Sequence, residues 1–250
     1  MFNLLAIDCG NSFVKWGLHD GDSWIIKHQV SWNDIDTLYS EFLNLSKPSH
    51  IYISFVARED LKIRISQLIL LWQADVQWIM SRSSQCYVTN TYVNPTQLGC
   101  DRWAALIASW FRLRQACLVI NVGTAMTVDV LTNEGIFSGG IILPGVYTMR
   151  NCLLYNTQIT YSRDGQYQDF PVCTEDGLMS GSIHALTGAI ERMHNLMTAQ
   201  LKSPIKYCVI SGGGACQIIP FLKLSYYWIE DLVLEGLVIM AKDDILNTQL

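Results

Sequence analysis

The stretch that decides the fold is Asn3-Leu-Leu-Ala-Ile-Asp8-Cys9-Gly10-Asn11-Ser12-Phe13-Val14-Lys15. Its apolar start predicts a buried strand that ends at Asp8, and residues 13–18 predict a second strand directly after the glycine turn. Because Gly10 lacks a Cβ, backbone N–H groups in this turn can approach a phosphate closely, and Ser12 can add a hydroxyl donor. The stretch predicts either a phosphate-binding turn or an ordinary hairpin turn with a capping aspartate.

Two charged side chains of this stretch favour the phosphate interpretation. Asp8 could hold Mg²⁺, directly or through water, because Mg²⁺ prefers hard oxygen ligands. Lys15 could neutralise phosphate charge, although a solvated lysine on one face of the strand is an equally good interpretation. The pattern is not a Walker loop, which requires G-x-x-x-x-G-K-[ST] followed by a helix.

The same order of elements begins again near residue 117. Strands are predicted over residues 3–8, 13–18 and 24–30 in the first half and over 117–121, 127–131 and 136–142 in the second. Each half therefore opens with a strand, a glycine turn, a strand, a hairpin and a strand. We expect two α/β domains, residues 1–115 and 116–250, that face a nucleotide cleft.

The remaining elements complete an α/β pattern. We expect strands over 50–55, 76–80 and 205–211. We expect helices over 34–45, capped by Asp34, over 60–72, from Asp101 to about 114, in a long stretch after Thr174, and over 232–241.

Two further glycine turns lie at positions where a nucleotide could bind. Gly123-Thr124 follows a strand at the point that matches Gly10, as a second phosphate turn would. Gly212-Gly213-Gly214 follows the strand over 205–211 and leaves room for a flat adenine or ribose, although a flexible strand-to-helix turn explains it as well.

A fourth candidate, Gly99-Cys100-Asp101-Arg102-Trp103, lies at a helix start. Asp101 could accept the proton of an attacking hydroxyl, and Arg102 could pair with a substrate carboxylate. The alternative is that Asp101 caps the helix and Arg102 is solvated.

Composition excludes several function classes. The 250 residues include 17 basic and 22 acidic side chains, with a formal charge of −5 and no basic run, so nucleic-acid binding has no electrostatic basis. No apolar run approaches the ~18 residues of a membrane span, and the chain opens with a strand, so we expect a cytoplasmic protein. The eight scattered cysteines predict reduced, buried side chains, and the five histidines form no cluster that predicts a metal site.

The four motifs, in this order and spacing, resemble the type III pantothenate kinases of the acetate and sugar kinase/Hsp70/actin superfamily. The resemblance extends from Leu4 to about Gly236. Its carriers are Asp8–Lys15, Leu98-Gly-Cys-Asp-Arg-Trp103, Gly123-Thr-Ala125, Gly139-Gly-Ile-Ile-Leu-Pro-Gly145 and Ser211-Gly-Gly-Gly214. It implies two actin-like (ribonuclease H-like) domains and ATP-dependent phosphorylation of pantothenate to 4'-phosphopantothenate, the first step of coenzyme A biosynthesis.

The resemblance also implies a role for individual residues. ATP phosphates would lie along Asp8, Cys9, Gly10, Asn11, Ser12, Phe13, Val14 and Lys15, with Asp8 serving Mg²⁺ and Thr124 also contacting ATP. Asp101 resembles the base that deprotonates pantothenate, whose pocket would be lined by Tyr92, Gly99, Cys100, Asp101, Arg102 and Thr174. A homodimer and a monovalent cation, K⁺ or NH₄⁺, are implied as well.

Asn121 departs from the family pattern, which usually places an aspartate there as a ligand of the monovalent cation. The asparagine carbonyl oxygen can coordinate K⁺ but brings no charge, so the K⁺ requirement should weaken. Two alternatives stay open at this point: a kinase of the same superfamily for another carboxylate or sugar acceptor, and a non-catalytic regulatory relative.

Overall fold

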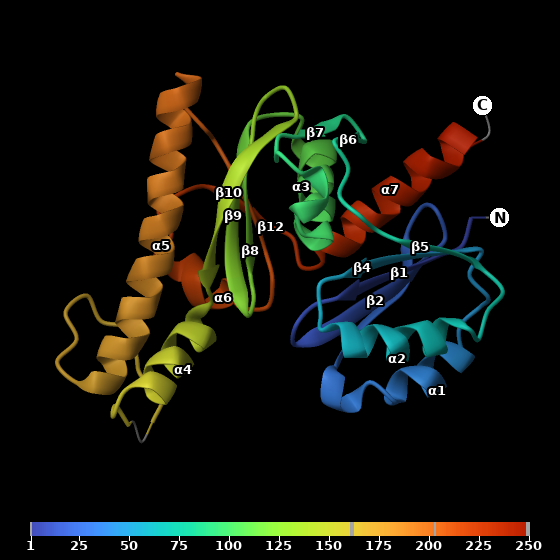
Figure 1. Ribbon diagram of the computed structural model, residues 1–250. Helices are drawn as coiled ribbons and strands as arrows, with labels where there is room; N and C mark the ends of the chain where they lie inside the picture. The colour runs from blue at the N-terminus through green and yellow to red at the C-terminus, as the bar shows by residue number, and fades with distance from the viewer. Residues whose placement is uncertain (1, 161–162, 203, 249–250) are drawn as a thin grey trace. The chain divides into compact units, whose positions relative to one another are not determined.

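The computed structural model describes residues 2–160, 163–202 and 204–248 (Figure 1). The chain divides into two compact units, Met1–Arg112 with Asp231–Leu250 and Leu113–Glu230, here called the first and the second unit. The first division lies close to the expected boundary at 115. The C-terminal segment from Asp231 onward, however, belongs to the first unit. We expected it in the second domain, residues 116–250.

The first unit contains a five-stranded mixed sheet in the order β3-β2-β1-β4-β5. Its strands are β1 (Leu4–Cys9), β2 (Phe13–His19), β3 (Trp24–Ser31), β4 (His50–Phe55) and β5 (Asp75–Trp78). β1, β2 and β3 pair antiparallel, whereas β4 and β5 run parallel to β1. Two short strands, β6 (Ser84–Gln85) and β7 (Val88–Asn90), form a hairpin in the loop before α3.

The second unit repeats this topology with the strand order β12-β11-β8-β9-β10. Its strands are β8 (Cys117–Val122), β9 (Ala125–Leu131), β10 (Ile136–Pro144), β11 (Cys208–Ser211) and β12 (Tyr226–Trp228). β8, β9 and β10 pair antiparallel, and β11 and β12 run parallel to β8. The predicted α/β fold, with a mixed sheet in each unit, is therefore confirmed.

The repeat extends to burial. β1 and β8 share one order of buried and half-buried positions, and β2 and β9 share another. A continuous apolar run suits a central strand, because helices or loops cover both of its faces. The shared apolar runs make the two halves recognisable from the sequence although their residues differ.

Helices cover both faces of the first sheet. α1 (Thr37–Leu43) and α2 (Glu59–Ile69) lie on one face, and α7 (Leu232–Thr248) lies on the other, where it packs against β1, β2 and β4 (Figure 1). The backbones of α7 and α3 (Cys100–Leu113) are so close that a Cβ on Gly236 would overlap the Ala104 carbonyl oxygen. This packing explains why α7 belongs to the first unit.

In the second unit, α4 (Val146–Asn156), α5 (Thr174–Leu201) and the short α6 (Ala215–Ile218) lie on one side of the sheet (Figure 1). The core there combines strand residues such as Leu118 and Ile120 with Leu186 and Ile190 of α5. In the part of the chain that the structure describes, three 3₁₀ turns, Trp32–Asp34, Pro95–Gln97 and Ile219–Phe221, complete the elements.

Several expectations need correction. Asp34 does not cap α1: it ends a 3₁₀ turn, its carboxylate accepts the Ser31 hydroxyl, and the residue before the helix is Asp36. All eight cysteines are free, as expected, but Cys152, Cys173 and Cys216 are exposed rather than buried. The final helix continues to Thr248, beyond the expected end at residue 241.

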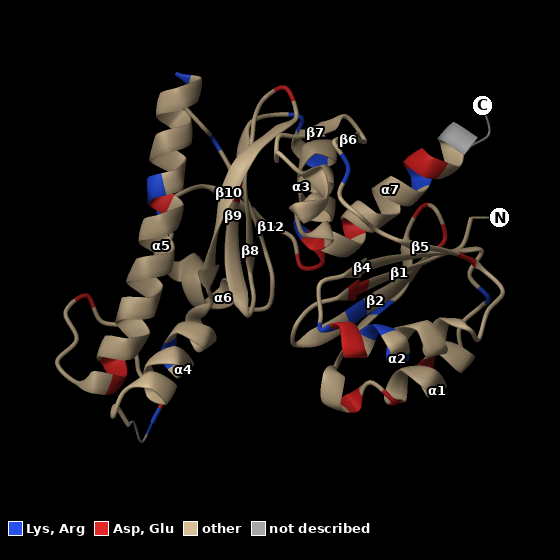
Figure 2. Ribbon diagram, viewed as in Figure 1, with Lys and Arg blue, Asp and Glu red and all other residues tan. Residues whose placement is uncertain are grey.

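Positions of basic and of acidic residues are interspersed along the ribbon of each unit (Figure 2). Among the described residues, no helix is long and apolar enough to cross a membrane.

Candidate active site

Asp8 and Lys15 lie opposite each other on β1 and β2. Directly opposed residues of an antiparallel pair project from the same face of the sheet, so the two side chains share one face. A hydrogen bond from the Gly10 N–H to the Phe13 carbonyl oxygen (3.0 Å) closes the turn between the strands, and Trp32 Nε1 donates to the Gly10 carbonyl oxygen (2.8 Å).

The rest of this turn divides into buried and exposed positions. Cys9 and Val14 are fully buried, whereas Asn11, Ser12 and Phe13 are exposed. Asn11 and Ser12 therefore lie at the surface of the turn, while the neighbouring apolar side chains anchor the turn in the core.

Asp8 carries the most unusual electrostatics of the site. Its Oδ1 atom is buried and has no hydrogen-bond partner among the described residues. Burial and then the negative charge of Asp101 raise the pKa of Asp8 from 3.8 to about 7, against the opposing effects of a Ser54 hydrogen bond and the Lys15 charge. A carboxylate in this state is well suited to a cation, which would neutralise it and occupy its unpartnered oxygen.

The N-terminus of α3 brings Asp101 to this carboxylate. Cys100 holds the start of this helix in place. The Cys100 sulfur accepts the Phe55 N–H (3.2 Å) and contacts the Ser54 hydroxyl (3.5 Å) at the end of β4. Ser54 in turn pairs with Asp8 in the parallel register of β1 and β4. The sequence elements 8–15 and 99–103 thus meet at the ends of neighbouring parallel strands, where ligands commonly bind in α/β sheets.

Asp101 is held by its own helix. Its Oδ1 accepts the Arg102 N–H (2.8 Å), and Gly99 leaves it room, because a Cβ on Gly99 would lie 2.5 Å from that oxygen. Burial raises the pKa of Asp101, while the Arg102 N–H and the Arg102 charge oppose the shift.

Arg102 is buried at 6% exposure, so the solvated alternative is wrong. Its Nη1 donates to the Tyr92 hydroxyl (3.3 Å), and its guanidinium lies 5.9 Å from the centre of the Tyr92 ring. The structure therefore brings together Tyr92 and Arg102, two residues expected at the acceptor pocket but separated by a loop and a 3₁₀ turn.

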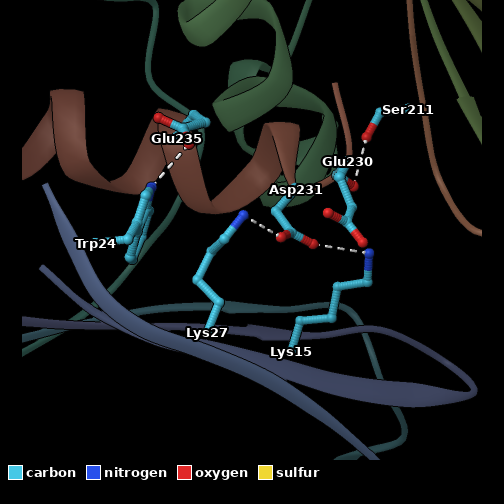
Figure 3. Close-up of polar contacts among 7 residues, drawn as sticks. All are labelled: Lys15, Trp24, Lys27, Ser211, Glu230, Asp231 and Glu235. Atoms are coloured by element: carbon cyan, nitrogen blue, oxygen red, sulfur yellow. Dashed lines mark hydrogen bonds and ion pairs between the residues drawn. The ribbon is translucent and has the colours of Figure 1, made fainter. Parts of the chain in front are cut away.

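Lys15 is ion-paired, and its side chain is only 22% exposed. Its Nζ lies 3.1 Å from Asp231 Oδ1, and Lys27 Nζ lies 2.7 Å from Asp231 Oδ2 (Figure 3). Sequence reasoning missed Asp231, because an acidic residue directly before a helix has the pattern of a cap. No signal in the sequence joins it to a lysine 216 positions away.

The glycine motifs of the second unit also converge. The Gly214 N–H donates to the Val122 carbonyl oxygen, and the Gly145 N–H donates to the Thr124 carbonyl oxygen (both 2.9 Å). A Cβ on Gly145 would overlap the Gly123 carbonyl oxygen. Gly212 has a φ of +96°, and a Cβ on it would overlap the Val122 carbonyl oxygen. Two motifs far apart in sequence, 139–145 and 211–214, thus pack closely against the Gly123-Thr124 turn because they lack side chains there.

Asn121 and Thr174 are the other expected contacts of the second unit. Asn121 is the next-to-last residue of β8 and lies beside Gly212, whose Cβ would lie 2.6 Å from Asn121 Oδ1. Thr174 is exposed at the first position of α5.

The donor set fits Mg²⁺ better than a metal that requires an all-protein cage. The described residues contain no group of three or more His, Cys, Asp or Glu side chains that could hold a metal ion. Mg²⁺ commonly binds through one or two carboxylates together with substrate phosphates and water, and Asp8 offers the unpartnered oxygen that such a site needs.

The family model for type III pantothenate kinase matches residues 4–196 of this chain. A type III pantothenate kinase of Nitrosospira multiformis is 44% identical over 240 residues, which cover 96% of this chain and 91% of the relative. That of Nitrosomonas eutropha is 42% identical over 242 residues, with 96% and 94% covered.

Solved structures with lower identity share the fold. A Baf family protein of Campylobacter jejuni superposes with a TM-score of 0.61 at 21% identity, covering 98% of this chain and 100% of the other. MreB5 of Spiroplasma citri bound to ADP superposes with a TM-score of 0.54 at 10% identity, covering 100% and 99%. Both likenesses agree with the expected actin-like fold.

Proposed function

This chain belongs to the type III pantothenate kinase family, and we propose that Asp8, Lys15 and Asp101 of its first unit carry the phosphoryl transfer. The chain phosphorylates pantothenate with ATP in coenzyme A biosynthesis. The observation that supports these residue roles is the junction of the two motifs: Cys100, next to Asp101, contacts Ser54, which pairs with Asp8 in the register of β1 and β4.

Asp101 acts as the general base. It accepts the proton of the primary hydroxyl of pantothenate while the hydroxyl oxygen attacks the γ-phosphorus and ADP leaves. Burial of Asp101 raises its pKa toward working pH, which makes a carboxylate a better proton acceptor. The remaining task is to position and stabilise charge, which dominates phosphoryl transfer.

Asp8 and Lys15 act on the phosphates. Asp8 would hold Mg²⁺, which when bound neutralises charge that develops on the phosphate oxygens. Lys15, on the same face of the sheet, contacts the phosphates as a point charge. The turn at the exposed residues Asn11 and Ser12 supplies backbone hydrogen bonds to the phosphates.

Arg102 and Tyr92 recognise the acceptor. A buried guanidinium beside a phenol offers a forked donor for the carboxylate of pantothenate. Gly99 and Cys100 complete this end of the site, and the acceptor contact implied for Thr174 stays a prediction.

In the second unit, Thr124 is proposed as an ATP contact and Asn121 as a weak ligand for K⁺ or NH₄⁺. Asn121 brings an oxygen but no charge, so the cation should bind less tightly than at an aspartate. The homodimer and the cytoplasmic location remain predictions.

A comparison of acceptors tests the proposal. Pantothenate, its alcohol analogue pantothenol and a simple sugar are offered with ATP in a coupled ADP-release assay, to wild type and to Arg102→Gln. Arg102→Gln should raise the KM for pantothenate roughly 10- to 100-fold, the KM for ATP should stay unchanged, and the preference for pantothenate over pantothenol should be lost. If Arg102→Gln kept the preference for pantothenate over pantothenol, the role of Arg102 would be refuted. If the wild-type protein released ADP only with the sugar, pantothenate would be refuted as the acceptor.

A further inference from the structure

We propose that Asp231 is a positioning residue for ATP binding, because its carboxylate holds the Lys15 ammonium beside the phosphate turn. The inference rests on the proposed phosphate contact of Lys15 and adds a residue that lies outside every motif of the site.

The geometry is a two-sided bridge. Asp231 directly precedes α7, and its side chain is 11% exposed. One carboxylate oxygen accepts Lys15 from β2 at 3.1 Å, and the other accepts Lys27 from β3 at 2.7 Å (Figure 3). A single carboxylate thus joins the start of a helix to two neighbouring strands.

Register explains how both lysines reach it. Lys27 pairs with Gly17, which lies two positions after Lys15 on β2, so the two lysines project from the same face. Asp8 lies on that face too, opposite Lys15.

Anchoring α7 does not account for the bridge, because other contacts already attach the helix. Trp24 Nε1 donates to Glu235 Oε1 (2.8 Å) one turn further along α7 (Figure 3). Gly236 packs on the Ala104 backbone. What Asp231 adds is the placement of two cations.

The charge balance leaves Lys15 able to attract phosphate. Burial raises the pKa of Asp231, but the hydrogen bond from Lys27 and the charge and hydrogen bond of Lys15 outweigh burial, so the net pKa is lowered and the group is ionised. Together, the one carboxylate and the two ammonium groups carry a net positive charge. Holding the flexible lysine before ATP arrives also reduces the entropy lost on binding.

The test compares Asp231→Asn with Glu235→Gln, a matched loss of one carboxylate on the same helix that keeps an acceptor for Trp24. Asp231→Asn should raise the KM for ATP roughly tenfold and leave the KM for pantothenate unchanged. Glu235→Gln should stay within about twofold of wild type. Asp231→Glu, which restores the charge, should recover most of the ATP affinity, whereas a purely structural loss would lower kcat for both variants.

A double-mutant cycle separates this inference from the function on which it rests. In a Lys15→Gln background, Asp231→Asn should have no further effect on the KM for ATP. If Lys15→Gln alone changes nothing, the phosphate role of Lys15 fails. If Lys15→Gln is impaired but Asp231→Asn behaves like Glu235→Gln, or binds ATP more tightly, only the positioning role of Asp231 is overturned.

Discussion

The negative charge of Asp101, at the start of α3, raises the pKa of Asp8, at the end of β1. The two carboxylates belong to motifs 93 positions apart, yet they act on one another in one unit. Like charges this close favour a single proton on the pair or a cation that replaces it. The nucleotide-free protein should therefore respond to pH through Asp8.

Asp8→Asn should change how stability depends on pH. Folded Asp8 keeps its proton up to about pH 7, whereas the unfolded chain releases it near 3.8. The wild-type protein therefore loses stability as pH rises through this window, by at most about 4 kcal/mol. Chemical unfolding without Mg²⁺, from about pH 4 to about pH 8, should show a larger loss in wild type than in the variant, which keeps only the smaller contribution of Asp101.

Asp20→Asn is a control for that experiment, because the Asp20 carboxyl contributes a pH dependence of stability of the opposite sign. Hydrogen bonds from the Ser23 and Asp22 N–H groups lower the pKa of Asp20, so its contribution is present at neutral pH and lost in acid. Parallel pH curves for wild type and Asp8→Asn would show that Asp8 titrates normally.

Asp101→Asn should lower kcat by about 10²- to 10⁴-fold, because the amide cannot accept the hydroxyl proton. The amide oxygen can still accept the Arg102 N–H, so the thermal unfolding midpoint should change little. Wild-type turnover in this variant would remove Asp101 from its role as base.

Asn121→Asp should strengthen the dependence of activity on K⁺, because a carboxylate adds charge to the proposed cation ligand. Asn133→Asp is the matched control: it makes the same change at an exposed turn residue of the same unit. The measurement is a K⁺ titration of kcat/KM at constant ionic strength. Equal titration curves for the two variants would contradict the proposed cation site.

Gly212→Ala should destabilise the second unit by roughly 1–3 kcal/mol, because the residue has a φ of +96° and a Cβ would overlap the Val122 carbonyl oxygen. Gly213→Ala, one position later, has no atom within 4 Å of its Cβ and should be nearly neutral in the same urea unfolding experiment. Similar losses for both would mean that the turn tolerates neither side chain for a reason other than overlap.

The sequence predicted the sheets well because their central strands are continuous apolar runs that end in glycine turns. It did not predict α4, whose only buried residues are Val146 and Arg150, so no apolar stripe marks that helix. Among site residues, those within one motif were predicted. Asp231 was not, since its partner is defined by the packing of α7 on the sheet and not by spacing along the chain.

The most direct test of the central claim is transfer of ³²P from the γ-phosphate of ATP to pantothenate by the purified chain, with Mg²⁺ and with or without K⁺. Wild type should form 4'-phosphopantothenate and ADP in equal amounts, and Asp101→Asn should form about 10²- to 10⁴-fold less. Labelled phosphate that appears only as inorganic phosphate, or equal product from both proteins, would contradict the account.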